Sequence, residues 1–208
     1  WAYVRAEDPG AALDRARQLR AALGDAVVLT EDLAGFTYRG GRDLSGYVDG
    51  TENPAGDAAV ACAIVTGAGE GLDGGSFAAT QRWVHDLDAL ARMAARARDE
   101  AIGRAIETDE ELADAPASAH VKRSAQESFD PPAHVLRRSM PYGDVAEHGL
   151  YFVAFGERLD RFERILRRMA GLDDGVADAL LRFSRPVSGA YYWCPPVRDG
   201  RLDLRALG

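Results

Sequence analysis

Arg137 lies inside an apolar run that predicts a β-strand, residues 134–140 with the sequence H-V-L-R-R-S-M. Because side chains alternate along a strand, Arg137 and Ser139 share one face and Arg138 lies on the other. One arginine should therefore point inward, where its guanidinium needs an anionic partner: a carboxylate, a phosphate, a propionate or a reaction intermediate. An edge strand with both arginines in water is the alternative interpretation.

Asp49 and His120 are two further residues whose placement needs an explanation. Asp49 lies in the stretch G-Y-V-D-G-T-E-N-P, residues 46–54, which is too short for a helix and too polar for a core. Asp, Gly, Asn and Pro are turn-forming residues, so a surface turn is one interpretation of this stretch. His120 lies in P-A-S-A-H-V, residues 116–121.

Familiar site motifs do not account for these residues. The glycines of residues 67–71 are spaced wrongly for a dinucleotide loop and precede a predicted strand instead of a helix. Residues 49–53 resemble the start of a calcium loop, but Pro54 stands where that loop requires glycine. The four histidines form no i, i+4 pair and have no cysteine beside them, so no zinc motif is present. A Ser-His-Asp triad stays open, although the G-x-S-x-G elbow is absent.

The composition excludes two classes of partner. The chain has 208 residues, enough for one or two domains, with 47% hydrophobic and 28% charged residues. A net charge of -8 disfavours nucleic acid, and no apolar run approaches the ~20 residues of a membrane helix. Cys62 and Cys194 are far apart and form no C-x-x-C, so we expect free thiols and a cytoplasmic protein.

The first 40 residues predict a strand, a helix and a strand. Residues 1–6 alternate, Asp8-Pro9 predicts a helix start, and Gly24 predicts its end. Residues 26–30, A-V-V-L-T, then predict a second strand. This content is half of a ferredoxin-like unit.

The chain from residue 76 onward predicts a complete ferredoxin-like unit, with strands and helices in the order β, α, β, β, α, β. The second helix, residues 157–170, carries an apolar stripe at helical spacing. A strand is also expected just before this unit, at residues 60–66. The predicted strands of the unit are residues 76–84, 134–140, 149–155 and 190–193, with helices from residue 86, over 157–170 and near 174–182.

Five ordered blocks resemble the dye-decolorizing peroxidases, in the bacterial B-type form. The first is D-L-S-G-Y-V-D-G-T-E-N-P, residues 43–54, which contains the G-x-x-D-G signature of that family. One such signature is weakly specific, but five blocks in the same order cover nearly the whole chain. The others are residues 75–85, 118–120, 135–142 with 148–152, and 181–192.

The resemblance implies a haem b site. Asp49 matches the distal aspartate, Arg137 the distal arginine and His120 the histidine that ligates haem iron. A haem with one axial histidine leaves its sixth position open to peroxide. Asp49 would move a proton between the two peroxide oxygens and Arg137 would stabilise developing charge.

Three further residues are candidates for contacts around this cofactor: Ser139, Glu52 and Asp178. Ser139 stands where some relatives have asparagine. Asp178 would accept the second N–H of the ligating imidazole, which orients the ring and raises its basicity. An exposed acid on a helix is the alternative for Asp178. Trp83, Tyr191, Tyr192 and Trp193 suit either electron transfer to bulky donors or a simple aromatic core.

The implied protein is an α+β haem peroxidase built from two ferredoxin-like domains with antiparallel sheets, a dimeric ferredoxin-like barrel. We expect residues 1–57 to be an incomplete N-terminal domain ending in the Asp49 loop, and residues 58–208 to be the haem-binding domain. Hydrogen peroxide and a small-molecule donor such as a dye, a phenol or a metal ion are the expected substrates. A haem-handling protein without turnover is the alternative. A homo-oligomer, with packaging in a protein shell as a further expectation, completes the list of partners.

Overall fold

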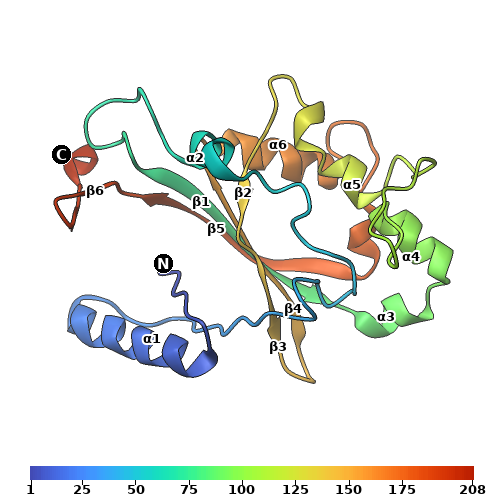
Figure 1. Cartoon of the computed structure of the whole chain (residues 1–208), viewed down its shortest axis with the longest axis horizontal. Helices are drawn as coiled ribbons and strands as arrows, with labels where there is room; N and C mark the ends of the chain where they lie inside the picture. The colour runs from blue at the N-terminus through green and yellow to red at the C-terminus, as the bar shows by residue number, and fades with distance from the viewer.

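A five-stranded antiparallel sheet forms the centre of the molecule in the computed structural model, which describes residues 1–208. The strand order is β2-β4-β1-β5, and β3 continues the β2 edge by pairing with β4. Helices connect β1 to β2 and β4 to β5, so the chain has the ferredoxin-like order (Figure 1). The predicted α+β fold is confirmed. The strands are β1 (Ser76–His85), β2 (Leu136–Arg137), β3 (Met140–Gly143), β4 (His148–Gly156) and β5 (Ser184–Cys194).

The remaining elements are short, apart from the first helix. None of the helices combines the length and the hydropathy that a membrane crossing needs. The helices are α1 (Pro9–Leu23), α2 (Gly56–Ala63), α3 (Leu87–Arg92), α4 (Ala95–Ile102), α5 (His120–Arg123) and α6 (Asp160–Met169). The 3-10 turns are Gly24–Ala26, Gln126–Ser128, Ala179–Arg182 and Arg205–Leu207, and β6 (Val197–Arg198) pairs with β7 (Arg201–Leu202).

The core lies between one face of the sheet and α6. The α6 side chains Phe162, Ile165 and Met169 are buried at helical spacing and pack with Ala79 and Trp83 of β1. Side chains two residues apart on a strand share a face, so Gln81 and His85 face the same side as Trp83. The predicted helix of residues 157–170 is thus confirmed as α6, with its ends drawn in by a few residues. This face of β1 supplies one wall of the site described below.

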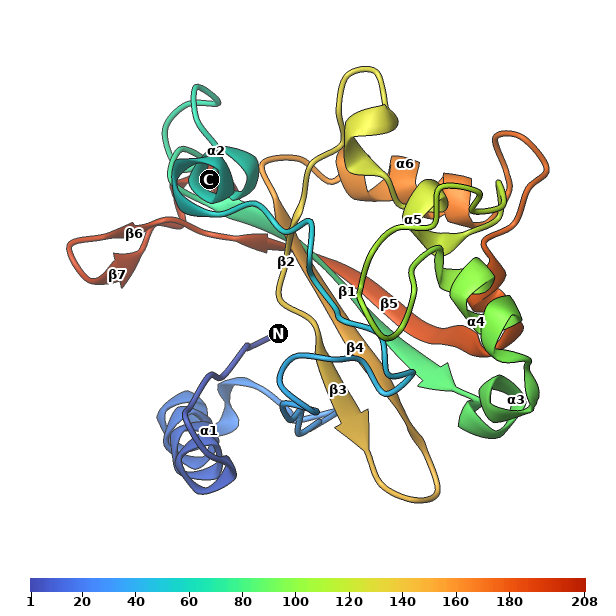
Figure 2. The same ribbon diagram turned by 45° about the vertical axis from the view of Figure 1, so that its right-hand side comes forward.

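The N-terminal segment covers the opposite face of the sheet. Trp1 stacks on Tyr3 and on Tyr192 of β5, and the Tyr3 hydroxyl donates to the Arg138 carbonyl at 3.0 Å. Helix α1 then lies on the side of the sheet away from α6 (Figures 1 and 2). The side chain of Asp8 accepts from the Ala11 N–H and Pro9 opens the helix, as the sequence predicts.

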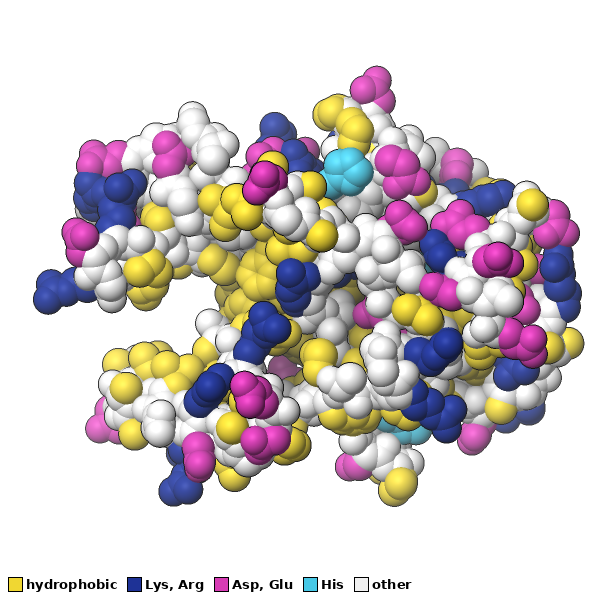
Figure 3. Space-filling model, viewed as in Figure 1, with side chains coloured by type: hydrophobic (Ala, Val, Ile, Leu, Met, Phe, Trp, Pro, Cys, Tyr) yellow, Lys and Arg dark blue, Asp and Glu magenta, His cyan; other side chains and the backbone are white.

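Three predicted strands are wrong. Residues 1–6 and 26–30 form no strand, because no neighbouring segment offers them a partner for the hydrogen bonds of a sheet. Val28 is left 85% exposed, and α1 buries no residue. Figure 3 shows apolar side chains along the notch between α1 and the rest of the molecule. Residues 60–66, the third error, begin inside α2, since the run A-V-A-C-A suits a helix as well as a strand.

Candidate functional site

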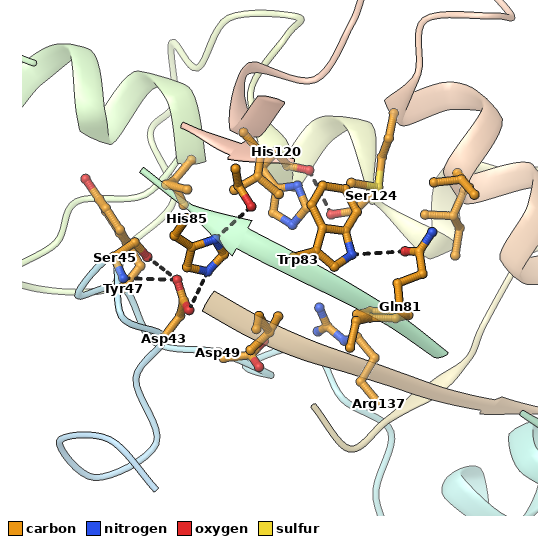
Figure 4. A pocket seen from close by; sticks show the side chains of 18 of the residues that line it. Asp43, Ser45, Tyr47, Asp49, Gln81, Trp83, His85, His120, Ser124 and Arg137 are labelled. Atoms are coloured by element: carbon orange, nitrogen blue, oxygen red, sulfur yellow. Dashed lines mark hydrogen bonds and ion pairs between the residues drawn. The ribbon is translucent and has the colours of Figure 1, made fainter. Parts of the chain in front are cut away.

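A largely apolar pocket lies between the sheet, α6 and the loop that carries Asp49 (Figure 4). The empty space that its walls surround is about 980 Å³, which includes space open to solvent. Three of the predicted residues, Asp49, His120 and Arg137, line it although they are far apart in sequence. The apolar walls come from β1, β4 and α6, through Trp83, Leu150, Phe152, Phe162, Leu166 and Met169.

His120 is the first residue of α5 and is held from behind by a buried carboxylate. Its Nδ1 lies 2.7 Å from Oδ2 of Asp178, whose side chain has no exposed surface. The other oxygen, Oδ1, accepts from the Leu180 N–H at 2.8 Å, so Asp178 is itself fixed. A carboxylate accepts the Nδ1 proton, which leaves Nε2 with a free lone pair on the pocket side. The structure therefore places Asp178 where the sequence proposes a partner for His120.

The backbone around α5 tolerates no larger residue at Gly103. This glycine has φ +94°, and a Cβ there would lie 2.3 Å from Cγ2 of Val121 and 3.1 Å from Cβ of Ala119. Ala119 itself has no exposed surface. The close approach of α4 to α5 at Gly103 thus fixes the position from which His120 enters the pocket.

Asp49 reaches the pocket on a loop pinned at Tyr47. The Tyr47 side chain is buried in a second apolar cluster, and its hydroxyl donates to Oδ1 of Asp99 at 2.7 Å. The Asp49 N–H donates to the Gly41 carbonyl at 3.2 Å. Gly50 follows with φ +81°, a conformation that side-chain-bearing residues rarely adopt, and nothing lies within 4 Å of a Cβ built there. The turn therefore needs this glycine for its backbone angles.

Arg137 points into the pocket from β2, and its guanidinium has no hydrogen bond or ion pair within the protein. The buried Nε of Arg137 has no hydrogen-bond partner. A buried cationic donor without a partner is costly unless an anion meets it. The neighbouring Arg138 turns away, and its Nη1 donates to the Arg137 carbonyl at 2.8 Å. Of the two interpretations of this strand, the structure favours an inward Arg137.

The acid and the guanidinium face the imidazole across the pocket. Figure 4 shows Asp49 and Arg137 on one side, His120 on the other and Trp83 on the sheet between them. The Trp83 Nε1–H donates to Oε1 of Gln81 at 3.1 Å, so the indole is fixed. The arrangement offers one bare imidazole nitrogen facing a proton carrier and a cation.

Ser139 and Glu52 lie outside the pocket lining. The Ser139 hydroxyl accepts the Val153 N–H at 3.3 Å, which a regular antiparallel ladder would give to the Arg138 carbonyl. That carbonyl accepts a hydrogen bond from the Tyr3 hydroxyl instead. The Ser139 hydroxyl therefore takes the place of a backbone acceptor at the edge of the sheet. The Glu52 side chain is 75% exposed and lies 3.5 Å from Arg104. The structure does not bring either residue together with the other candidates.

Asn53 joins the Asp49 loop to the strand of Arg137, and sequence reasoning missed this role. Its Nδ2 donates to the Arg137 carbonyl and its Oδ1 accepts the Arg137 N–H, both at 2.9 Å. The Asn53 amide thus makes the two hydrogen bonds that a neighbouring strand would make with the backbone of Arg137. The only sequence signal was the position of Asn53 four residues after Asp49 in the same turn.

Replacing Asn53 with alanine should destabilise the fold by about 1–3 kcal/mol, because both backbone groups of Arg137 lose their partner. Urea unfolding followed by circular dichroism measures this. Thr51→Ala is the matched control, since Thr51 is exposed in the same loop. Equal unfolding midpoints for the two variants would contradict the role given to Asn53.

The pKa values of the two pocket carboxylates, Asp43 and Asp49, shift in opposite directions. Burial raises the pKa of the Asp49 carboxyl above its ordinary value of 3.8, although nearby Arg137 offsets part of the effect. Burial alone would also raise the pKa of Asp43. Hydrogen bonds from His85 and Ser45 outweigh it and bring the Asp43 pKa below 3.8.

These directions predict opposite effects of pH on stability. With its raised pKa, Asp49 binds more protons in the folded state, so its contribution falls as pH rises from 3.8 through the folded value. With its lowered pKa, Asp43 adds stability above 3.8 that is lost as pH falls through the folded value. At neutral pH we expect Asp49→Asn to raise the urea midpoint and Asp43→Asn to lower it. At acidic pH both differences should shrink, and midpoints that move in the same direction would contradict the assignment.

Comparisons with known proteins point to one family. The model of the Dyp-type peroxidase C-terminal family matches residues 40–199. Among curated proteins, the dye-decolorizing peroxidase of Mycobacterium tuberculosis is 31% identical over 201 residues, covering 94% of this chain and 60% of that protein. The dye-decolorizing peroxidase of Brevibacterium linens is 32% identical over 200 residues, covering 93% and 54%. The chain thus spans about three fifths of the length of the curated relatives it matches.

Solved structures agree with this match. A dye-decolorizing protein from V. cholerae superposes with a TM-score of 0.80 at 35% identity, over 87% of this chain and 62% of that one. DypB from Rhodococcus jostii RHA1 superposes with a TM-score of 0.86 at 31% identity, over 92% and 64%. A variant of that DypB was solved in complex with haem.

Proposed function

Because this chain belongs to the Dyp-type peroxidase family, through that family's C-terminal part, we propose that it forms the haem site of a peroxidase. The observation that carries the proposal is the pocket itself. One imidazole, fixed by a buried carboxylate, faces an aspartate and an arginine with an unpartnered buried Nε across a largely apolar space. Haem-bound relatives with the same fold support the choice of cofactor.

The residues present fit a haem on three counts. The walls are largely apolar, as the porphyrin face requires. The free Nε2 of His120 is a typical axial ligand for haem iron. The unpartnered Nε of Arg137 offers a cationic donor to an anionic group.

When bound, haem would supply a redox-active iron for the chemistry of peroxide. His120 would hold the group through Nε2, with Asp178 fixing the orientation of the ring. Asp49 accepts the proton from one peroxide oxygen on its carboxylate and returns it to the other. Its raised pKa brings the carboxyl closer to neutral pH, which suits a group that takes and gives a proton in one cycle.

Arg137 stabilises the negative charge that develops on the departing oxygen. Its guanidinium stays charged at any working pH, and the apolar walls strengthen its field. The chain holds Arg137 ready through the Asn53 amide, so little reorganisation is needed when charge appears.

The overall reaction converts one hydrogen peroxide, two protons and two electrons into two waters. We propose that the electrons come from a small donor of the dye, phenol or metal-ion class, and the names of the relatives support the dye. A cytoplasmic location is proposed from the two free thiols, Cys62 and Cys194. A homo-oligomer and a surrounding protein shell remain predictions.

Steady-state peroxide consumption by the haem-loaded protein tests the proposal. We expect turnover with a dye or phenol as donor, and none without donor after the first equivalent of peroxide. Haem that binds with a histidine-ligated spectrum but supports no turnover would instead favour a haem-handling protein. Free haem at the same concentration is the control for uncatalysed oxidation.

A further inference from the structure

His85 is a buried imidazole that the chemistry proposed above does not use. It ends β1 on the pocket face of the sheet, and its side chain is 3% exposed. Its two ring nitrogens both have partners: Nε2 lies 3.1 Å from Oδ2 of Asp43, and Nδ1 lies 2.8 Å from Oγ of Ser184. Figure 4 shows Asp43 beside the ring, on the side of the Asp49 loop. The three side chains form one continuous hydrogen-bonded chain.

The hydrogen-bonded side chains of Asp43, His85 and Ser184 connect two cavities. Asp43, His85 and Ser184 all line the pocket that holds Asp49 and Arg137. His85 and Ser184 also line a second, more open cleft on the far side, formed by the β1–α3 junction, the β3–β4 turn and the start of β5. These two buried residues are the ones shared by both cavities. Two side chains that can pass protons therefore face both cavities.

The protonation states of Asp43 and His85 set the direction in which a proton can move along these three side chains. Asp43 keeps its charge at neutral pH, because His85 and Ser45 donate to it and lower its pKa. An ionised Asp43 accepts from Nε2 of His85, so a neutral ring carries its proton on Nε2 and accepts from Ser184 at Nδ1. Ser45 holds Oδ1 of Asp43 through its hydroxyl at 2.6 Å and its N–H at 3.0 Å. Each member is thus set to receive from the outer cleft and give toward the inner pocket.

The proposed reaction needs such a route, since two protons are consumed for each peroxide and the walls around Asp49 are mostly apolar. Asp49 alone returns the proton that it takes and supplies no net proton. Asp43 lies close enough to Asp49 for its charge to raise the Asp49 pKa, so the end of the chain and the proton carrier interact.

We propose that Ser184, His85 and Asp43 form a proton relay that carries protons from the outer cleft to the Asp49 side of the pocket; this inference rests on the proposed function. Water in the outer cleft gives a proton to Ser184 Oγ, and Ser184 gives its own to Nδ1 of His85. Nε2 then releases its proton to Asp43, which passes it through pocket water to Asp49. The ring then swings toward the outer cleft that it lines, where water takes the Nδ1 proton and another water gives one to Nε2, and it swings back, so that one proton has crossed and every group is restored.

Charged groups on the surrounding elements influence how readily protons from solvent reach Ser184 at the outer cleft. The outer cleft is lined by both signs of charge, which keeps it wet and lets it exchange protons with solvent. These groups are Asp86 and Asp88 after β1, Asp144 and His148 around the β3–β4 turn, and Arg182 and Arg185 at the start of β5.

The test compares His85→Gln and Ser184→Ala with wild type, all loaded with haem, in stopped-flow mixing with peroxide at low buffer concentration. Glutamine keeps a donor for Asp43 but cannot pass a proton between two nitrogens. We expect both variants to retain the wild-type haem spectrum and to react about 10²-fold more slowly, the lower end of the range for loss of a proton-transfer group. Raising the concentration of a small buffer, which can enter the open cleft, should restore part of the rate in His85→Gln. His148→Gln is the matched control, because His148 lines the same cleft outside the relay.

Three results would overturn the relay. Unchanged rates in both variants would overturn the relay and leave the proposed function standing. Slow rates that added buffer does not change would do the same, since they indicate that His85 and Ser184 only position the loop. Nitrogen NMR of the haem-free protein gives a readout independent of activity: a neutral His85 ring bare at Nε2 would contradict the direction of transfer. A wild-type protein that does not react with peroxide at all would overturn the proposed function and the relay with it.

Discussion

Replacing His120 with alanine should abolish axial ligation of haem iron, since no other side chain in the pocket presents a bare imidazole nitrogen at that place. The Soret band of the histidine-ligated haem should be lost. Imidazole added to the variant should restore it by occupying the space of the missing ring. Absorption spectroscopy of the ferric protein measures both effects.

The His120 variant needs one precaution, because Asp178 would lose its partner in a fully buried position. An unsatisfied buried acceptor costs about 1–3 kcal/mol. The double variant His120→Ala with Asp178→Asn removes the buried charge and keeps the shape. His134→Ala is the control, since His134 is exposed away from the pocket. Haem spectra identical to wild type in the His120 variants would exclude this residue as the ligand.

Replacing Arg137 with alanine should slow the reaction with peroxide by roughly 10² or more, the effect of removing one preorganised stabilising group. The rate constant is measured by stopped-flow mixing at matched haem occupancy. Arg137→Lys should recover only part of the rate, because a single ammonium lacks the planar fork of donors.

Arg138→Ala is the matched control for Arg137, because it removes the same charge from the neighbouring residue of the same strand edge. Its guanidinium turns back to the Arg137 carbonyl and does not line the pocket. A rate near wild type is expected for this control. Equal losses in both variants would mean that general charge near the strand matters and not the position of one guanidinium.

The order of strands and helices from residue 76 onward could be predicted from the sequence, because each element there carries a clear period. Helix α6 has its apolar residues three and four apart, and β1 and β4 pair over eight residues each with a matching partner. Residues 26–30 carry an equally clear strand pattern but find no neighbour. A strand is stabilised by a partner that its own sequence does not contain.

The functional site also contains residues that the sequence predicts and residues that it does not. His120, Asp49 and Arg137 could be predicted as candidates, and the fold brings all three to one pocket. Ser139 shares its face with Arg137 by alternation, yet its hydroxyl replaces a backbone acceptor of the sheet edge, which spacing alone does not reveal. Asn53 and His85 have roles that depend on partners 84 and 99 residues away. Such pairings follow from tertiary structure, so no local sequence pattern predicts them.

The central claim is that one imidazole and an opposing acid and guanidinium form a haem peroxidase site. An absorption spectrum of the protein with one equivalent of ferric haem, recorded before and after one equivalent of hydrogen peroxide, tests it most directly. We predict a Soret band distinct from that of free haem, and a rapid change of that band on adding peroxide. A spectrum that matches free haem, or a bound spectrum that peroxide leaves unchanged, would contradict the account.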